Sequence, residues 1–307
     1  MNTLYRTLGI SKQAVWEHFK RERQQLDLIE QLMDQVDQRR SEHPGEGLTK
    51  LYWQLTPEGL GRDKFCRVFK QLGYGLQRRR NPIRTTLPVH TVFKNLVEGR
   101  WVDGPCQVWQ SDITYIKVGE QFCYLTFILD VYTRRIVGWA ASRTLQAKAN
   151  ERALKRALDG VDPEQLAGLV HHSDRGSQYS SERYLQMLRG HKIQISMGES
   201  ATDNAFAERI NGIIKGEYLQ RWPLKSFRQL CGKTKRAVSD YNNKRHHGAL
   251  GRRSPAQFEQ DYWRLAPARR PGQSIRSLQT PSFLEAGLQK ALVEHQPQYP
   301  YCVYELS

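Results

Sequence analysis

Residues 108–142 read VWQSDITYIKVGEQFCYLTFILDVYTRRIVGWAAS, and this stretch decides the fold. It contains three runs rich in β-branched and aromatic side chains, separated by Gly119-Glu120 and Thr133-Arg134. Runs of this kind with short turns between them predict three consecutive strands, which are most simply joined as an antiparallel meander.

Helical and strand patterns alternate after this meander. Helices are predicted at 147–160, 181–190 and 203–219, and short apolar strands at 166–174 and 193–197. Three strands followed by helix, strand, helix, strand and helix predict a mixed five-stranded α/β sheet with helices packed on it.

The chain before the meander is predicted to be all-α. Residues 3–23 have the pattern of a helix-turn-helix, with Gly9 in the turn and Ser11 capping the second helix. A polar helix follows at 21–40, and residues 48–73 form a second helical pair after a Pro-Gly break. Such patterns fit DNA contact through a major groove, and a plain helical hairpin explains them equally well.

The charge of the chain points to an anionic partner. The net charge is +16 at pH 7, which favours nucleic acid first and an acidic membrane surface second. No apolar run is long enough to cross a bilayer, so no membrane span is expected. The five cysteines are scattered and lack CxxC spacing, and the first residues do not resemble a secretory signal. We therefore expect a reducing cytoplasm.

Three acids occupy unusual positions in this predicted fold. Asp112 lies inside the first strand, Asp174 ends the fourth, and Glu208 is one turn into a helix whose other face is apolar. A buried carboxylate needs a cation or several donors, and sites gather at strand ends. Together the acids would suit Mg²⁺ and in-line phosphoryl transfer. Taken singly, Asp112 is more often a salt-bridged strand residue, Asp174 a turn former and Glu208 a solvated helix charge, but their order along the chain favours a joint site.

Other side chains are candidates for DNA contact or for support of the acids. Asp130 could rival Asp112, but we expect it to shape a turn or support the core. The residues predicted to contact DNA are Arg62, Lys64, Arg67, Arg78, Arg79, Arg80, Lys215 and Arg245. The predicted auxiliary residues near the acids are His172, Asn204, Tyr241 and His246. Ordinary roles as solvated charges or polar helix ends stay open for these side chains.

Four motifs follow one another along the chain: VWQSDITYI (108–116), HHSDRGSQYSS (171–181), DNAFAERINGIIKGE (203–217) and YNNKRHHGALGRRSPAQFE (241–259). Together they resemble the motifs of bacterial insertion-sequence transposases with a retroviral-integrase-type DDE core. The resemblance covers roughly residues 43–259.

This resemblance implies a ribonuclease-H-like fold, two Mg²⁺ ions that Mn²⁺ can replace, and the cutting and joining of element ends. It also implies that Asp112, Asp174 and Glu208 are the catalytic, metal-binding triad. The spacing between Asp174 and Glu208 is slightly shorter than is usual in the family, and we place the shortening in the loop 198–202.

We therefore expect a DNA transposase that binds terminal inverted repeats and target DNA as a homo-oligomer at the bacterial nucleoid. A catalytically inactive, sequence-specific DNA-binding regulator is the alternative, and a structure-specific nuclease is a third possibility. Four domains are predicted: a helix-turn-helix with connecting helix (1–42), a second helix-turn-helix-like DNA-binding domain with a basic linker (43–90), the ribonuclease-H-like integrase core (91–262) and a C-terminal extension of unknown role (263–307).

Overall fold

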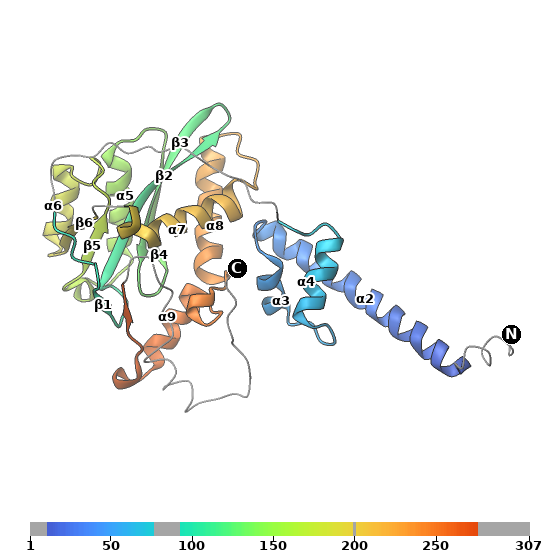
Figure 1. Cartoon of the computed structure of the whole chain (residues 1–307). Helices are drawn as coiled ribbons and strands as arrows, with labels where there is room; N and C mark the ends of the chain where they lie inside the picture. Colours follow the sequence, from blue (N-terminus) through green and yellow to red (C-terminus); the bar gives the residue numbers. More distant parts are fainter. Residues whose placement is uncertain (1–10, 77–92, 199–200, 276–307) are drawn as a thin grey trace. The chain divides into compact units, whose positions relative to one another are not determined.

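The computed structural model describes residues 11–76, 93–198 and 201–275 (Figure 1). The chain divides into two compact units, Met1–Arg80 and Asn81–Ser307, and each has its own hydrophobic core. Among the described residues, no helix is both long enough and apolar enough to cross a membrane.

The N-terminal unit is a small helical domain. It consists of α2 (Lys12–Glu42), α3 (Leu48–Leu55) and α4 (Arg62–Gln71). Leu32 and Val36, in the C-terminal half of α2, are buried in one cluster with side chains of α3 and α4. The predicted boundary between residues 42 and 43 thus runs through one compact unit, and the predicted domain limits stay predictions.

α2 corrects the prediction of two separate helices. One helix of 31 residues runs through the region where a second helix and a polar helix were expected. No glycine or proline interrupts residues 12–42, so nothing in the local sequence ends the helix earlier. Ser11 caps α2 as predicted, because its side chain accepts a hydrogen bond from the backbone N–H of Ala14 at 3.0 Å. Residues 1–10, with the first helix of the predicted pair, lie outside the described residues.

The second unit contains the predicted mixed sheet. Its strands are β2 (Val108–Val118), β3 (Gln121–Asp130), β4 (Ile136–Ser142), β5 (Val170–Ser173) and β6 (Gln194–Met197). The strand order is β4-β3-β2-β5-β6. β2, β3 and β4 pair antiparallel as a meander, whereas β5 and β6 continue the sheet in parallel. This confirms the mixed five-stranded, ribonuclease-H-like arrangement.

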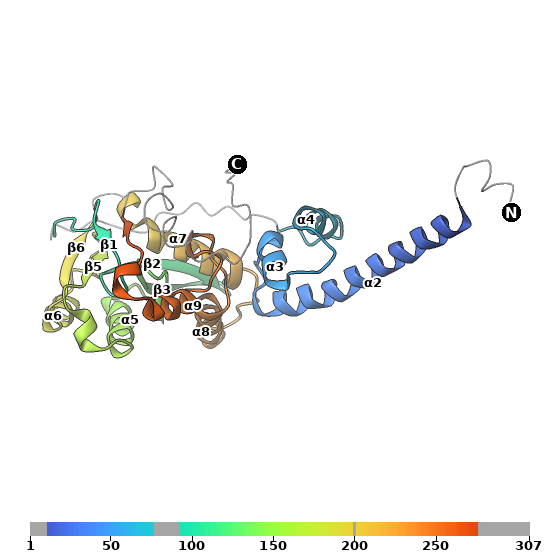
Figure 2. The ribbon, with the colours of Figure 1, turned by 90° about the horizontal axis from the view of Figure 1, so that it is seen from below.

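Helices flank the sheet in two groups (Figures 1 and 2). α5 (Ala147–Asp159) and α6 (Glu182–Gly190) share one hydrophobic cluster with residues of β2, β3 and β4. α7 (Ala205–Ile213) and α8 (Phe227–Asn243) share another. The two clusters together hold the sheet between helices, as the alternating sequence pattern predicts.

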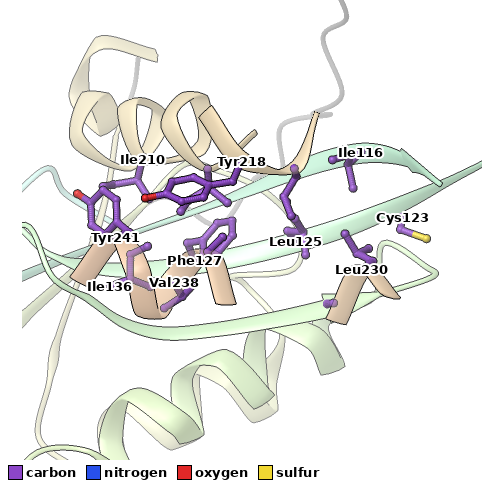
Figure 3. Close-up of a cluster of buried hydrophobic side chains, with 14 of the residues drawn as sticks. Ile116, Cys123, Leu125, Phe127, Ile136, Ile210, Tyr218, Leu230, Val238 and Tyr241 are labelled. Carbon is purple, nitrogen blue, oxygen red and sulfur yellow. The ribbon is translucent and has the colours of Figure 1, made fainter. Parts of the chain in front are cut away.

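Side chains of β3 alternate between these two clusters. Leu125 and Phe127 are buried with Ile210 of α7 and Val238 of α8 (Figure 3). Ile128, the residue after Phe127, is buried with the helices of the other cluster. Since successive side chains of a strand point to opposite faces, this single strand fixes both layers of the core.

The segment after the core helices packs back onto the sheet unit. α9 (Pro255–Arg264) is followed by β7 (Gln273–Ser274), which pairs antiparallel with β1 (Trp101–Val102). The hydroxyl of Tyr132 donates to the carbonyl oxygen of Pro271 at 2.6 Å. The first residues of the predicted C-terminal extension are therefore part of the core unit, while residues 276–307 lie outside the described residues.

The predicted single helix 203–219 consists of three segments. A 3₁₀ turn (Ala201–Asn204) precedes α7, and a π-helical segment (Ile214–Leu219) follows it. Asn204, not Asp203, occupies the N-cap position, and its side chain does not cap the helix. Its Nδ2 donates to the carbonyl oxygen of Ser111 on β2, and its Oδ1, the atom that would cap the helix, has no hydrogen-bond partner among the described residues.

Gly138 is the point where β4 and α5 approach most closely. A Cβ at this position would collide with the carbonyl oxygen of Ala153 and lie 2.9 Å from the Cβ of Ala157. We expect Gly138→Ala to lower the free energy of unfolding by about 2–3 kcal/mol, measured by urea denaturation, because backbone atoms must move. Gly232→Ala is the matched control: Gly232 is an exposed glycine of α8 with open space around it, so it should be neutral or stabilising.

Candidate active site

The register of two parallel strands sets Asp112 beside Asp174. β2 and β5 pair in parallel, with Ser111 opposite Ser173. The next residue on each chain segment is an aspartate, so the two backbones are separated by about one strand spacing, roughly 4.8 Å. Both aspartates are half-buried. This pairing brings together two acids that are far apart in the sequence.

The side chain of Gln110 fastens the helix that carries Glu208 onto β2. Its Nε2 donates to the carbonyl oxygen of Asp203 at 3.1 Å, and its Oε1 accepts from the backbone N–H of Ala207 at 3.3 Å. Gln110 is fully buried, so both bonds are shielded from water. They hold the first turn of α7, and with it Glu208, against the strand of Asp112.

Two further amides continue this contact between α7 and β2. Asn204 donates through Nδ2 to the carbonyl oxygen of Ser111 at 2.9 Å. Asn211 donates through Nδ2 to Oδ2 of Asp112 at 2.7 Å. Both asparagines are buried. Asn211 lies three residues after Glu208, so one face of α7 presents an acid and an amide toward the same strand.

The three predicted catalytic carboxylates influence one another. Burial, followed by the negative charges of Asp174 and Glu208, raises the pKa of Asp112 from 3.8 to about 7. Burial also raises the pKa of Asp174 and of Glu208, and the charge of Asp174 adds to the effect at Glu208. Although the loop before it is shortened, Glu208 therefore lies close enough to the aspartates for the negative charges to interact. A bound cation would relieve the desolvation and the repulsion together.

The chemistry of these donors fits a hard divalent cation. All three side chains offer carboxylate oxygens, the ligands that Mg²⁺ prefers. As the described side chains stand, no group of three or more His, Cys, Asp or Glu residues is arranged to hold a metal ion. Glu208 is exposed, whereas the two aspartates are half-buried. Metal binding by the three acids thus stays a prediction.

The loop after β5 is built around Asp174. The backbone N–H of Gly176 donates to Oδ1 of Asp174 at 3.0 Å, and a Cβ at Gly176 would lie 2.9 Å from that oxygen. The hydroxyl groups of Tyr179 and Ser111 hydrogen-bond at 2.9 Å, which ties the loop to β2. Tyr179 was not among the predicted site residues. It could have been recognised in the sequence as an aromatic residue in a loop that is otherwise small and polar.

Lys215 lies near Asp112. Its Nζ is 4.5 Å from the centre of the Tyr115 ring. Burial lowers the pKa of Lys215, and the negative charge of Asp112 acts in the opposite direction. Lys215 belongs to the π-helical segment after α7, and such segments are frequent at functional sites. The structure thus places the predicted DNA-binding lysine beside a predicted catalytic acid.

The predicted auxiliary residues fall in different places. His172 is buried on β5, where Nδ1 hydrogen-bonds Oγ of Ser196 at 2.9 Å, and burial lowers its pKa to about 4. The ring is therefore neutral at physiological pH, which removes it as a cationic partner of the acids. Asn204 belongs to the contact between α7 and β2. Tyr241 and His246 lie at and beyond the C-terminal end of α8, where Tyr241 is buried and His246 half-buried.

Arg245 is buried beside Tyr241 in a second polar cluster. Its Nε and Nη2 donate to the two carboxylate oxygens of Glu217, at 2.7 and 2.8 Å. This bidentate pair ties the segment after α8 to the π-helical segment. The position of Arg245 favours a structural role over the predicted DNA contact.

Asp130, the rival acid, supports a turn as expected. Its Oδ2 accepts from the backbone N–H of Cys106 at 2.7 Å. Its Oδ1 accepts from the backbone N–H and the hydroxyl of Thr133, at 2.8 and 2.9 Å. With both oxygens used by structural donors, Asp130 is not available as a ligand or base.

The predicted DNA-binding residues of the N-terminal unit lie on α4. Arg62, Lys64 and Arg67 are exposed. Arg62 pairs with exposed Asp63 at 2.9 Å, and Lys64 donates to the side chain of Gln25 at 3.0 Å. Both are surface contacts of small energy that DNA could replace. The three successive arginines at 78–80 lie outside the described residues.

A mixed sheet with aspartates on adjacent parallel strands, and a glutamate on the helix packed across them, defines an integrase-type polynucleotidyl transferase core. Two models of the integrase core domain match the chain, at residues 103–202 and 189–255. The transposase for insertion sequence element IS629 of Shigella sonnei is 34% identical over 227 residues, covering 72% of this chain and 76% of the relative. The chain belongs to the insertion-sequence transposases with an integrase core domain.

Other similarities were also found. Transposase InsF for insertion sequence IS3A of Escherichia coli is 33% identical over 173 residues, covering 55% of this chain and 59% of the relative. The HTLV-2 integrase catalytic core domain in complex with magnesium is 19% identical, with a TM-score of 0.41, and covers 54% of this chain and 99% of that one. A simian T-cell lymphotropic virus intasome in complex with PP2A regulatory subunit B56 gamma is 16% identical, with a TM-score of 0.47, and covers 76% and 80%.

Proposed function

We propose that this transposase performs strand cleavage and strand transfer at one site formed by Asp112, Asp174 and Glu208. In cleavage, water attacks a phosphodiester at an element end and releases a 3′-OH. In transfer, that 3′-OH attacks the phosphorus of a second phosphodiester in line, and the 3′ oxygen of the attacked strand leaves as a new 3′-OH. The single observation that supports this site most strongly is the register of Ser111 opposite Ser173, which sets the two aspartates on neighbouring strands.

Two Mg²⁺ ions, or Mn²⁺ in their place, would be held by the three carboxylates and would neutralise charge on the reacting phosphate. The chain's own residues supply the positioning. The hydrogen bonds of Gln110 hold the first turn of α7, which carries Glu208, against β2, and the bond from the backbone N–H of Gly176 orients Asp174. Lys215 adds a positive charge at the side of Asp112, where a DNA phosphate could approach.

DNA recognition is assigned to the helical N-terminal unit. α3 and α4 form a helix pair, and exposed Arg62, Lys64 and Arg67 give α4 a basic surface suited to DNA phosphates. The ligands would be the terminal inverted repeats of the element and the target DNA, bound by a homo-oligomer. We expect the protein to act in the cytoplasm, at the nucleoid.

Incubating the full chain with DNA that carries the ends of its own element tests this function. We expect Mg²⁺-dependent nicking at the element ends and joined products on a sequencing gel. Binding without nicking at any Mg²⁺ or Mn²⁺ concentration would identify the inactive regulator instead. Cleavage without joined products would identify a structure-specific nuclease.

Mg²⁺ binding should depend on pH through Asp112. Ligation requires the ionised carboxylate, and the pKa of this group is about 7, so protons compete with the metal below that pH. We expect the Mg²⁺ concentration for half-saturation to rise about tenfold for each pH unit below about 7 and to level off above it. The Mg²⁺-dependent rise in unfolding temperature measures this without DNA. A half-saturation independent of pH in this range would contradict the assignment.

A further inference from the structure

Asn211 makes a contact unlike the other amides of α7. Its Nδ2 donates to Oδ2 of Asp112 at 2.7 Å, whereas Gln110 and Asn204 bond only to backbone groups. A bond this short to a carboxylate is charge-assisted and stronger than a neutral amide contact. Asn211 therefore acts on the orientation of a predicted catalytic side chain, while the other two act on the position of the helix.

The carboxylate of Asp112 is held at both oxygens. Oδ2 accepts from Asn211, and Oδ1 accepts from the backbone N–H of Ile113 at 2.9 Å. Two donors on opposite oxygens fix the plane of the carboxylate, and each oxygen keeps a lone pair for another partner.

Keeping an amide at this position has an energetic cost. Asn211 is 7% exposed, and its Oδ1 is buried without a hydrogen-bond partner among the described residues. Rotating the amide would place that oxygen against the carboxylate of Asp112, where the two groups would repel. The NH₂ group therefore stays toward Asp112, and the oxygen stays unpaired. A leucine of similar volume would pack α7 against β2 without this cost. The amide is explained by its effect on Asp112 rather than by helix packing.

We infer that Asn211 is a positioning residue, which holds the Asp112 carboxylate in the orientation that binds a divalent cation. The inference rests on the proposed function, because it concerns the same cation site. Replacing Asn211 should therefore lower the affinity for the cation, whether or not DNA is bound. Removing a hydrogen-bond partner of a metal-ligating group typically lowers the affinity for the metal by about 10–100-fold.

The test compares Asn211→Leu and Asn211→Ala in the full chain by titrating Mg²⁺ and following the rise in unfolding temperature without DNA. Leucine keeps the volume and removes the donor, and alanine serves if leucine does not fold. Both should need about tenfold more Mg²⁺ for half-saturation. Cleavage should show the same shift in Mg²⁺ dependence, with much of the rate recovered at saturating Mg²⁺. Mg²⁺ half-saturation equal to that of the unaltered chain would overturn the inference.

Asn150→Ala is the matched control. Asn150 is equally buried, and its Oδ1 accepts a hydrogen bond from the hydroxyl of Thr126 at 2.7 Å, so its loss weakens the contact between α5 and β3 on the other face of the sheet. It should lower the unfolding temperature without changing the Mg²⁺ concentration for half-saturation. An equal shift in both variants would show that only helix packing matters. If the unaltered chain gave no Mg²⁺ response at all, the proposed metal site itself would be wrong.

Discussion

Asp112→Asn abolishes strand cleavage, with an expected initial rate at least about a thousandfold below that of the unaltered chain. Asparagine has nearly the same shape, but it offers one neutral oxygen in place of a charged carboxylate. Cleavage of a labelled duplex with an element end at saturating Mg²⁺ measures the effect. A gel shift with the same duplex should show unchanged binding, because the predicted recognition surface lies in the other unit. Near-normal cleavage by this variant would remove Asp112 from the site.

The same substitution should stabilise the metal-free chain. Folding raises the pKa of Asp112 from 3.8 to about 7, so the folded state favours the protonated form. The stabilisation that this proton provides is complete below the unfolded pKa and is lost as the pH rises through about 7. At about pH 8 the ionised carboxylate therefore costs free energy, and asparagine removes that cost. One of the two donors that bond Asp112, Nδ2 of Asn211 or the backbone N–H of Ile113, must then face the new NH₂ group, which offsets part of this gain. We expect a net gain of about 1 kcal/mol there, shrinking as the pH falls.

Thermal unfolding in the presence of a chelator measures this gain. Asp159→Asn is the control, because Asp159 is an exposed partner of Lys155 on α5 and its loss should change little. A stable, inactive Asp112→Asn chain would show that the site keeps its acids together at the expense of stability. A loss of stability at about pH 8 would instead mean that Asp112 supports the fold.

The local sequence predicted most of the sheet. The run from Val108 to Val118 is a strand over its full length, and Gly119 makes the turn to β3 with a positive φ of 60°. These features depend on neighbouring residues alone: strand-forming side chains and a glycine suited to the turn. Asp112 could also be proposed, because a carboxylate within an apolar strand is unusual wherever that strand lies. Asp174 and Glu208 were proposed from the order of the three acids along the chain and from the family resemblance.

The details of the site could not be predicted, because they depend on pairing between distant segments. Nothing in the sequence near Ser111 indicates that Ser173 will lie opposite, yet this register places the aspartates together. Gln110 reads as an ordinary polar strand residue until Ala207 is known to lie against it. Its role is set by tertiary packing, which local patterns do not encode.

Charge alone did not indicate where the predicted DNA-binding cations lie in the fold. Arg245 and Lys215 looked like similar cations, but Arg245 is buried against Glu217 and Lys215 lies beside Asp112. A buried arginine needs a partner acid, and the sequence separation of this pair gave no sign of it. In α2, no glycine or proline between residues 12 and 42 ends the helix, so the two predicted helices form one continuous helix.

Asp130→Asn should give the opposite outcome to Asp112→Asn. Both oxygens of Asp130 accept hydrogen bonds, from Cys106 on one side and Thr133 on the other. An asparagine must turn its NH₂ group toward one of these donors, which leaves a buried backbone N–H without an acceptor. We expect the free energy of unfolding to fall by about 3–5 kcal/mol, measured by urea denaturation. Asp130→Ala, which loses all the acceptors, should fall at least as far.

The chemistry should survive this loss of stability. Asp130 touches none of the three predicted catalytic acids in its hydrogen bonds, so the fraction of Asp130→Asn chains that stays folded should cleave element ends normally. Cleavage at low temperature, corrected for the folded fraction, separates the two roles. If the corrected rate fell as far as that of Asp112→Asn, Asp130 would have to be reconsidered as a member of the site. A folded, stable Asp130→Asn chain would instead show that its buried bonds to the turn at Thr133 contribute little, and that the pairing of β3 and β4 holds that turn alone.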